Sequence, residues 1–201
     1  MRVVAADLAC ERSGRPVFRN LSFTVAGGEG LVLTGRNGAG KSSLLMMLAG
    51  QIVPAAGRLA VEDAPAEKTL PELAHYIGHR DALKPSLTPL ESLGFWQAML
   101  GHAARAPQEA LERLGLGHAG DLPCAYLSAG QRRRLALARL LVSSRPVWLL
   151  DEPTAALDAA SQRLFDALVD EHLAAGGLAI AATHVPLGFR TATRLAIGGT
   201  P

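Results

Sequence analysis

This 201-residue sequence has few aromatic side chains and no large excess of charge of either sign. Aromatic residues make up 4% of the chain, which leaves few surfaces on which unpaired bases could stack. Basic residues number 20 and acidic residues 18, so the formal net charge of +2 creates no dominant field for a polyanion. We therefore expect no nucleic-acid partner.

Long apolar runs and clustered cysteines are also absent from the sequence. The best candidate for a membrane span, residues 135–150, is interrupted by Arg139 and Arg145, whereas a spanning helix needs about 20 uninterrupted apolar residues. Cys10 and Cys124 form no metal-spaced cluster and are too few to staple a secreted fold, so we expect reduced thiols. Any association with a membrane is expected to come through a partner.

The hydrophobic pattern predicts alternating strands and helices. Hydrophobic residues make up 49% of the chain, which suits one globular domain. Apolar runs predict strands, and capped periodic segments predict helices. The expected strands are residues 3–9, 17–25, 31–34, 76–77, 147–150 and 178–182, and the expected helices are 41–49, 89–100, 107–114, 128–142 and 160–175. We expect residues 1–201 to form one α/β domain with a β-rich N-terminal portion, a mostly parallel sheet and a helical insertion at about residues 81–145.

A glycine-rich segment between a predicted strand and a predicted helix fits the P-loop pattern G-x-x-x-x-G-K-[ST]. The glycines let main-chain N–H groups wrap around phosphates, Lys41 reaches the β and γ phosphates, and Ser42 is suited to bind Mg²⁺. A plain glycine-rich turn would also start a helix, but the strand before it and the helix after it favour a P-loop NTPase. The predicted nucleotide-binding residues are Gly35, Arg36, Asn37, Gly38, Ala39, Gly40, Lys41, Ser42 and Ser43.

Two carboxylates follow the predicted strand at residues 147–150. In a P-loop enzyme the first of them, Asp151, would hold Mg²⁺, and Glu152 would then be free to orient or deprotonate the attacking water. An acidic pair at the end of a strand is by itself more often a solvated turn. The P-loop earlier in the same chain makes the catalytic interpretation the stronger one.

The segment Leu127-Ser128-Ala129-Gly130-Gln131 resembles the LSGGQ signature of ABC ATPases. A plainer interpretation is also open, because Ser128 and Gln131 match the capping box of a helix start. In the ABC family the signature of one subunit closes on the nucleotide held by the other. The resemblance therefore implies a homodimer in which Ser128, Gly130 and Gln131 bind nucleotide across the interface.

Further segments resemble the same family in the expected order. Residues 155–158 resemble its D-loop, and His184, just after the last predicted strand, resembles its switch histidine, which implies a catalytic role beside Glu152 and Lys41. His79 stands where most relatives have the Q-loop glutamine, which places it near the metal. Arg12 stands where an aromatic side chain usually stacks on adenine, and Phe18 is the alternative for that role.

Three segments, residues 78–85 with 87–91, residues 127–134 and residues 183–188, resemble the ATP-binding subunits of bacterial cytochrome c biogenesis transporters, the haem exporter ATPases. This resemblance implies ATP and Mg²⁺ as cofactors and separate integral membrane permease subunits that dock near His79 and the helical insertion. It also implies a peripheral position at the cytoplasmic face of the bacterial inner membrane, with hydrolysis coupled to haem export or handling. An ABC transporter for another solute and a soluble, non-transport ABC ATPase are the alternatives.

Three consecutive arginines, Arg132 to Arg134, follow the signature. Basic side chains in the first turn of a helix oppose the helix dipole. We expect them to meet solvent, a neighbouring carboxylate or a nucleotide phosphate, and we favour a solvated face.

Overall fold

The computed structural model describes residues 1–65, 67–184, 189 and 192–198. Residues 185–188, part of the third segment that resembles cytochrome c biogenesis ATPases, lie outside the described residues. Within the described chain the strands form a three-stranded antiparallel sheet, in the order β2-β1-β4, and a five-stranded sheet, in the order β5-β6-β7-β3-β8. The strands are β1 (Arg2–Arg12), β2 (Arg15–Ala26), β3 (Gly30–Thr34), β4 (Ala56–Glu62), β5 (Ala74–Ile77), β6 (Val147–Asp151), β7 (Leu178–Ala182) and β8 (Ala192–Ala196).

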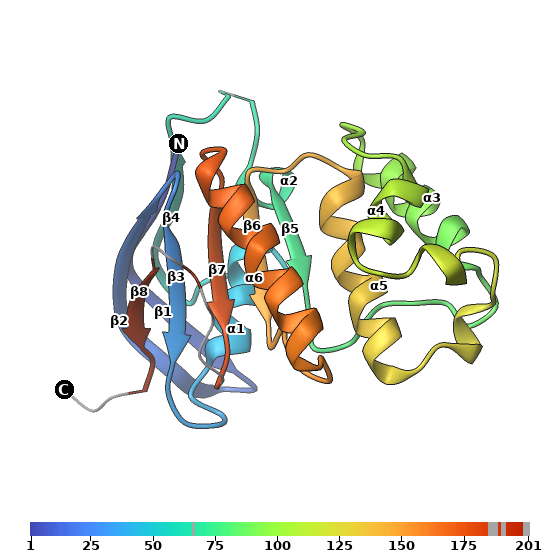
Figure 1. The fold of residues 1–201 in the computed structure, drawn as a ribbon. Helices are drawn as coiled ribbons and strands as arrows, with labels where there is room; N and C mark the ends of the chain where they lie inside the picture. The colour runs from blue at the N-terminus through green and yellow to red at the C-terminus, as the bar shows by residue number, and fades with distance from the viewer. Residues whose placement is uncertain (66, 185–188, 190–191, 199–201) are drawn as a thin grey trace.

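Neighbouring strands of the larger sheet run parallel, as the alternation of strands and helices predicts. Every residue of β6 and β7 is buried, as is usual for central strands covered on both faces. The helices are α1 (Lys41–Leu48), α2 (Leu70–Leu73), α3 (Pro89–Leu100), α4 (Pro107–Arg113), α5 (Ala129–Val142) and α6 (Ala159–Ala174), and short 3-10 turns span Gly117–Ala119 and Cys124–Tyr126. Figure 1 shows α3, α4 and α5 gathered on the side of the molecule away from β1, β2 and β4.

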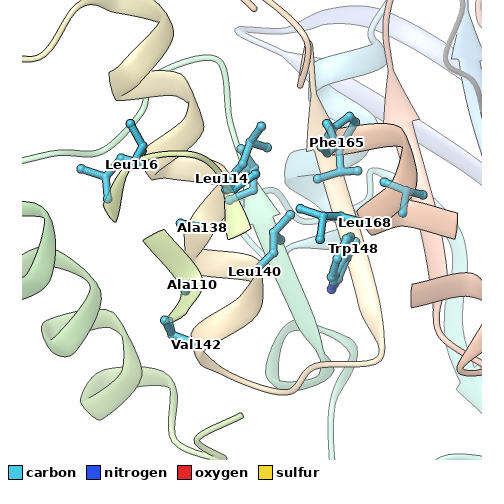
Figure 2. Close-up of a cluster of buried hydrophobic side chains, with 14 of the residues drawn as sticks. Ala110, Leu114, Leu116, Ala138, Leu140, Val142, Trp148, Phe165 and Leu168 are labelled. Carbon is cyan, nitrogen blue, oxygen red and sulfur yellow. The ribbon is translucent and has the colours of Figure 1, made fainter. Parts of the chain in front are cut away.

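The larger sheet separates two apolar clusters. One of them contains side chains from α4, α5 and α6 together with Trp148 of β6, and Figure 2 shows Leu140, Phe165 and Leu168 among them. The other cluster joins α1 to both sheets, because Leu44 and Leu45 pack with Val3 of β1 and Leu149 of β6. The helix that follows the predicted P-loop is therefore held by apolar contacts to both sheets.

Three elements were not expected from the sequence: β4, α2 and β8. The residues of β4 are exposed or half-buried throughout, and its apolar run, Leu59-Ala60-Val61, is too short to predict a strand. Strand β8 is similarly exposed and is recruited by main-chain pairing with β3. Helix α2 has only one turn, set by a capping box between Thr69 and Glu72.

Two histidines are largely buried, one in the larger sheet and one on helix α6. His75 of β5 is 2% exposed, and its Nε2–H donates to the carbonyl oxygen of Ser143 at 2.8 Å. His172 of α6 stacks on Trp148 with ring centroids 3.9 Å apart. Burial lowers the pKa of each imidazole to about 4, because the apolar surroundings disfavour the charged form.

The depressed pKa of His75 predicts a loss of stability in mild acid. The unfolded chain takes up this proton near pH 6.5 and the folded chain only near pH 4. The contribution of His75 to the free energy of unfolding is therefore at its maximum above pH 6.5. It declines as the pH falls toward 4, by at most about 3 kcal/mol. Urea midpoints measured between pH 7.5 and 4.5 should fall less steeply for His75→Gln, which keeps a donor for Ser143 but does not titrate.

The matched control for that experiment is His118→Gln, because His118 is exposed. Its urea midpoints should follow those of the parent at every pH. Parallel curves for the parent and His75→Gln would show that burial of His75 does not govern the acid response.

Candidate functional site

The loop between β3 and α1 follows a path that requires glycine at both ends. Gly35 has φ 136° and Gly40 has φ 105°, which side-chain-bearing residues rarely adopt. A Cβ atom at Gly35 would lie 2.4 Å from the carbonyl oxygen of Ile197, and one at Gly40 would lie 2.6 Å from Cγ1 of Val17. Close packing against neighbouring strands thus fixes the loop that the sequence predicts to wrap phosphate.

Lys41 and Ser42 open helix α1 directly below this loop. The ammonium group of Lys41 is buried and donates to the carbonyl oxygens of Gly35 at 2.7 Å and Arg36 at 3.2 Å. The hydroxyl of Ser42 donates to Oδ1 of Asp151 at 3.1 Å. A buried cation and a hydroxyl–carboxylate pair therefore lie side by side at the start of the helix.

Glu152 directly follows strand β6, in a conformation that is unusual for a residue with a side chain. Its φ of 47° is left-handed, which costs about 1–3 kcal/mol when the surrounding structure imposes it. Its main-chain N–H donates to the carbonyl oxygen of Ala182, the last residue of β7, at 2.8 Å. Its Oε1 lies 3.6 Å from Nε2 of His184, so the ends of neighbouring strands bring the carboxylate and the imidazole together.

These groups share a cavity of about 610 Å³. Besides the residues above, His79 after β5 and Ala155 also reach it. The lining residues are Val17, Asn37, Gly38, Gly40, Lys41, Ser42, Ser43, His79, Asp151, Glu152, Ala155 and His184. The cavity is lined by the ammonium of Lys41, by the glycine-rich loop and by the carboxylates of Asp151 and Glu152. These groups are suited to hold a phosphate chain together with a divalent metal ion.

The signature residues lie elsewhere in the same chain. Ser128 caps α5: its hydroxyl accepts from the Gln131 N–H at 3.2 Å, and Oε1 of Gln131 accepts from the Ser128 N–H at 2.8 Å. The plainer interpretation, a capping box, is thus confirmed as a local structure. In the described part of the chain, Ser128, Gly130 and Gln131 do not line the cavity around Lys41.

Neither residue expected to stack on adenine lines the cavity. Arg12 is exposed at the end of β1. Phe18, the alternative, is only 7% exposed and belongs to the core beneath Gly40, so that alternative was wrong. Val17 reaches the cavity instead. Strand alternation was the available signal, because neighbouring residues of a strand point to opposite faces.

The expectation of a solvated arginine cluster is wrong for its middle member. Arg133 is 3% exposed and donates to main-chain carbonyl groups around the cavity, including Glu152 at 2.7 Å. The flanking side chains are half-buried and cap nearby carbonyls: Arg132 bonds to Leu127 and Arg134 to Leu114. Tertiary packing places these acceptors, and the local sequence gives no sign of them.

Comparison with known proteins identifies the family. The model of the ABC transporter family matches residues 18–155. The cytochrome c biogenesis ATP-binding export protein CcmA of Rhodopseudomonas palustris (strain HaA2) is 54% identical over 95% of this chain and 96% of its own. CcmA of Bradyrhizobium diazoefficiens is 53% identical over 99% of both chains. This chain is an ABC ATPase of the CcmA family.

This CcmA-family chain has the same fold as a solved structure. A putative ABC transporter ATP-binding protein from Pyrococcus furiosus superposes with a TM-score of 0.83 over 97% of this chain and 98% of its own, at 21% identity. That likeness concerns the fold alone. Among the described residues of this CcmA-family member, no helix combines the length and the apolar character that crossing a bilayer requires.

Removal of the buried ammonium group should strongly weaken ATP binding by this CcmA-family ATPase. Lys41→Ala leaves the carbonyls of Gly35 and Arg36 without their donor and takes away the buried cation of the phosphate loop. The Kd for a fluorescent ATP analogue should weaken by at least about tenfold, as expected for the loss of a charge-assisted contact. Lys84→Ala, at an exposed lysine, is the control and should bind like the parent. Equal Kd values for both variants would refute the P-loop assignment.

Proposed function

We propose that this ABC ATPase drives cytochrome c biogenesis, with haem export or haem handling as the work coupled to hydrolysis. The observation that carries the proposal is the 53–54% identity to CcmA proteins over nearly the full length of both chains. The geometry of the cavity supports the hydrolytic part. Haem itself is expected to be handled by other subunits.

For hydrolysis, we propose that the P-loop amides and Lys41 bind the β and γ phosphates. Glu152 orients a water and accepts its proton as the oxygen attacks the γ-phosphorus, and the bond from that phosphorus to the β–γ bridging oxygen breaks. His184, whose Nε2 lies 3.6 Å from Oε1 of Glu152, contacts the γ-phosphate and helps Glu152 to hold the water. Arg12 lies on the same hairpin as Val17 and is proposed to stack its guanidinium on the adenine.

Magnesium fits the donors that the cavity offers. Among the described residues no group of three or more histidine, cysteine, aspartate or glutamate side chains could hold a metal by itself. Mg²⁺ instead keeps several waters and takes one or two protein oxygens together with phosphate oxygens. We propose Ser42 and Asp151 as its protein ligands, with His79 beside them. When bound, Mg²⁺ neutralises charge on the β and γ phosphate oxygens.

The place of the signature supports a homodimer. Ser128, Gly130 and Gln131 begin helix α5, whose free N–H groups are suited to bind an anion, but they lie outside the cavity of their own chain. We propose that a second copy presents these residues to the nucleotide. Two ATP molecules would then lie between two chains arranged head to tail.

Glu152→Gln should keep ATP and lose turnover. The amide preserves the size of the side chain but cannot accept the proton of the attacking water. ATP with Mg²⁺ should therefore shift the variant to a stable dimer in size-exclusion chromatography with light scattering, whereas the parent turns over and dissociates. Adding Lys41→Ala to this variant supplies the control, because it removes nucleotide binding and should restore the monomer. ATP hydrolysis at the parental rate by Glu152→Gln would show that the base is misassigned.

A second cavity, of about 670 Å³, suits the membrane partner implied by the names of the relatives. It lies beside His79, and its lining includes Met46 of α1, Tyr76 of β5 and Trp96 of α3. On α3 the neighbouring side chains of Phe95 and Met99 are 56% and 54% exposed. We propose that an integral membrane subunit docks here, which would hold the ATPase at the cytoplasmic face of the bacterial inner membrane.

Truncation of the exposed aromatic side chain on α3 should release the membrane partner. Phe95→Ser removes an apolar anchor of a kind that often dominates interfaces, so the affinity should fall by at least about tenfold. The measurement is co-purification from detergent extracts, with mass spectrometry to identify the integral membrane protein retained. The ATPase rate of the isolated subunit should not change.

Leu164→Ser, at another exposed apolar side chain on α6, is the matched control and should retain the partner. Retention of the same membrane protein by Phe95→Ser would place the docking surface elsewhere. Recovery of a membrane protein that has no part in cytochrome c biogenesis would favour the alternative of another solute.

A further inference from the structure

The side chain of Arg133 ends where three segments of the chain meet. From α5, its Nε–H donates to the carbonyl oxygen of Pro153 at 3.0 Å. Its Nη2 donates to the carbonyl oxygens of Asp151 at 2.9 Å and Glu152 at 2.7 Å. One planar group thus holds three successive carbonyls at the end of β6.

The other side of the same guanidinium reaches the segment after β5. Nη1 donates to the carbonyl oxygen of Gly78 at 2.9 Å and to Oδ1 of Asp81 at 3.1 Å. Gly78 directly precedes His79, which lines the cavity around Lys41. The backbone that positions Glu152 and the backbone that positions His79 are therefore bonded to one side chain.

This arrangement requires an arginine. A guanidinium offers five N–H groups in a fixed plane, whereas a lysine ammonium offers three on one flexible atom. The residue is 3% exposed and Asp81 is the carboxylate that the structure pairs with it, so most of its partners are uncharged carbonyls. Burying a cation among mostly uncharged partners adds little stability, because the cost of removing the charge from water offsets the gain from its contacts. It is a good way to fix the relative positions of the groups that it bonds.

We propose that Arg133 is a positioning residue for ATP hydrolysis. It braces the left-handed backbone of Glu152 and keeps that carboxylate at a fixed distance from the His79 segment. Since Arg133 belongs to the helix that begins at Ser128, it also ties the signature helix to the hydrolytic carboxylate. The inference rests on the proposed role of Glu152 as the group that activates water.

Arg133→Lys tests the proposal because it keeps the charge and removes the planar set of donors. The kcat for ATP should fall by about ten- to a hundredfold, the loss expected when a reacting group is displaced by about 1 Å. The KM and the Kd for a fluorescent ATP analogue should stay within about twofold, because the P-loop is untouched. The matched control is Arg134→Lys on the same helix, whose guanidinium bonds to the carbonyls of Leu114 and Gly115. Its kcat should match that of the parent.

A double variant separates positioning from a general loss of structure. In the Glu152→Gln background Arg133→Lys should cause no further loss in single-turnover hydrolysis, because both changes act on the same carboxylate. A multiplicative further loss, or a fall in nucleotide affinity that parallels kcat, would make Arg133 a structural residue and overturn the proposal. An unchanged kcat in folded Arg133→Lys would do the same.

Asp81→Asn decides the question where Arg133→Lys does not fold. It removes only the half-buried anion that faces Nη1, and it should lower kcat selectively by a smaller factor. An unchanged kcat in this variant would count against the proposal. Parental turnover by Glu152→Gln would defeat the proposed base, whereas inactive Glu152→Gln beside fully active Arg133→Lys would defeat only the role of Arg133.

Discussion

Parallel pairing of β3, β5, β6 and β7 determines where the chemistry of this protein can occur. Their registers align Leu33 with Ala182, Asp151 with Ala182, and Ile77 with Leu150. The residues that follow these strands therefore emerge at one edge of the sheet, although they come from four separate parts of the sequence. Main-chain hydrogen bonds between strands, together with the burial of β6 and β7 on both faces, bring a P-loop, a carboxylate pair and two histidines together.

The charges at this edge lie against main-chain carbonyls more often than against opposite charges. Lys41 bonds to Gly35 and Arg36, and Arg139 bonds to Tyr76 and lies over the ring of Trp96. Burial lowers the pKa of Arg139 to about 10, but the side chain stays a cation at neutral pH. Carbonyl partners cannot move without moving the backbone. Such contacts make the edge stiff, which is the property that phosphoryl transfer requires of its surroundings.

The sequence was sufficient for elements whose cause is local. The P-loop, the capped start of α5 and the apolar strand before Asp151 each have a pattern that follows from neighbouring residues, and their helices and strands were placed within one or two positions. Strands β4 and β8 could not be predicted, because their own residues have no strand pattern. They become strands by pairing with β1 and β3, which are distant in sequence. The role of Arg133 was hidden for the same reason: its acceptors lie 18 to 55 positions away in sequence. Phe18 and Val17 differ only in which face of β2 they occupy, and the tertiary fold decides which face meets the P-loop.

Helix α5 links regions that the sequence treats separately. It begins at the capped signature residue Ser128, presents Arg133 to the ends of β5 and β6, and presents Arg139 to the cavity between α1 and α3. At 1.5 Å per residue, the signature and Arg139 are separated by about 16 Å along one hydrogen-bonded rod. A rod of this length shifts or tilts more readily than it bends, because its buried face packs against α3, α4 and the sheet. A displacement at the proposed docking cavity would therefore be transmitted to the signature and to the carboxylate through the same helix. Arg133 would transmit it to Glu152, because its guanidinium donates to the main-chain carbonyl of that residue.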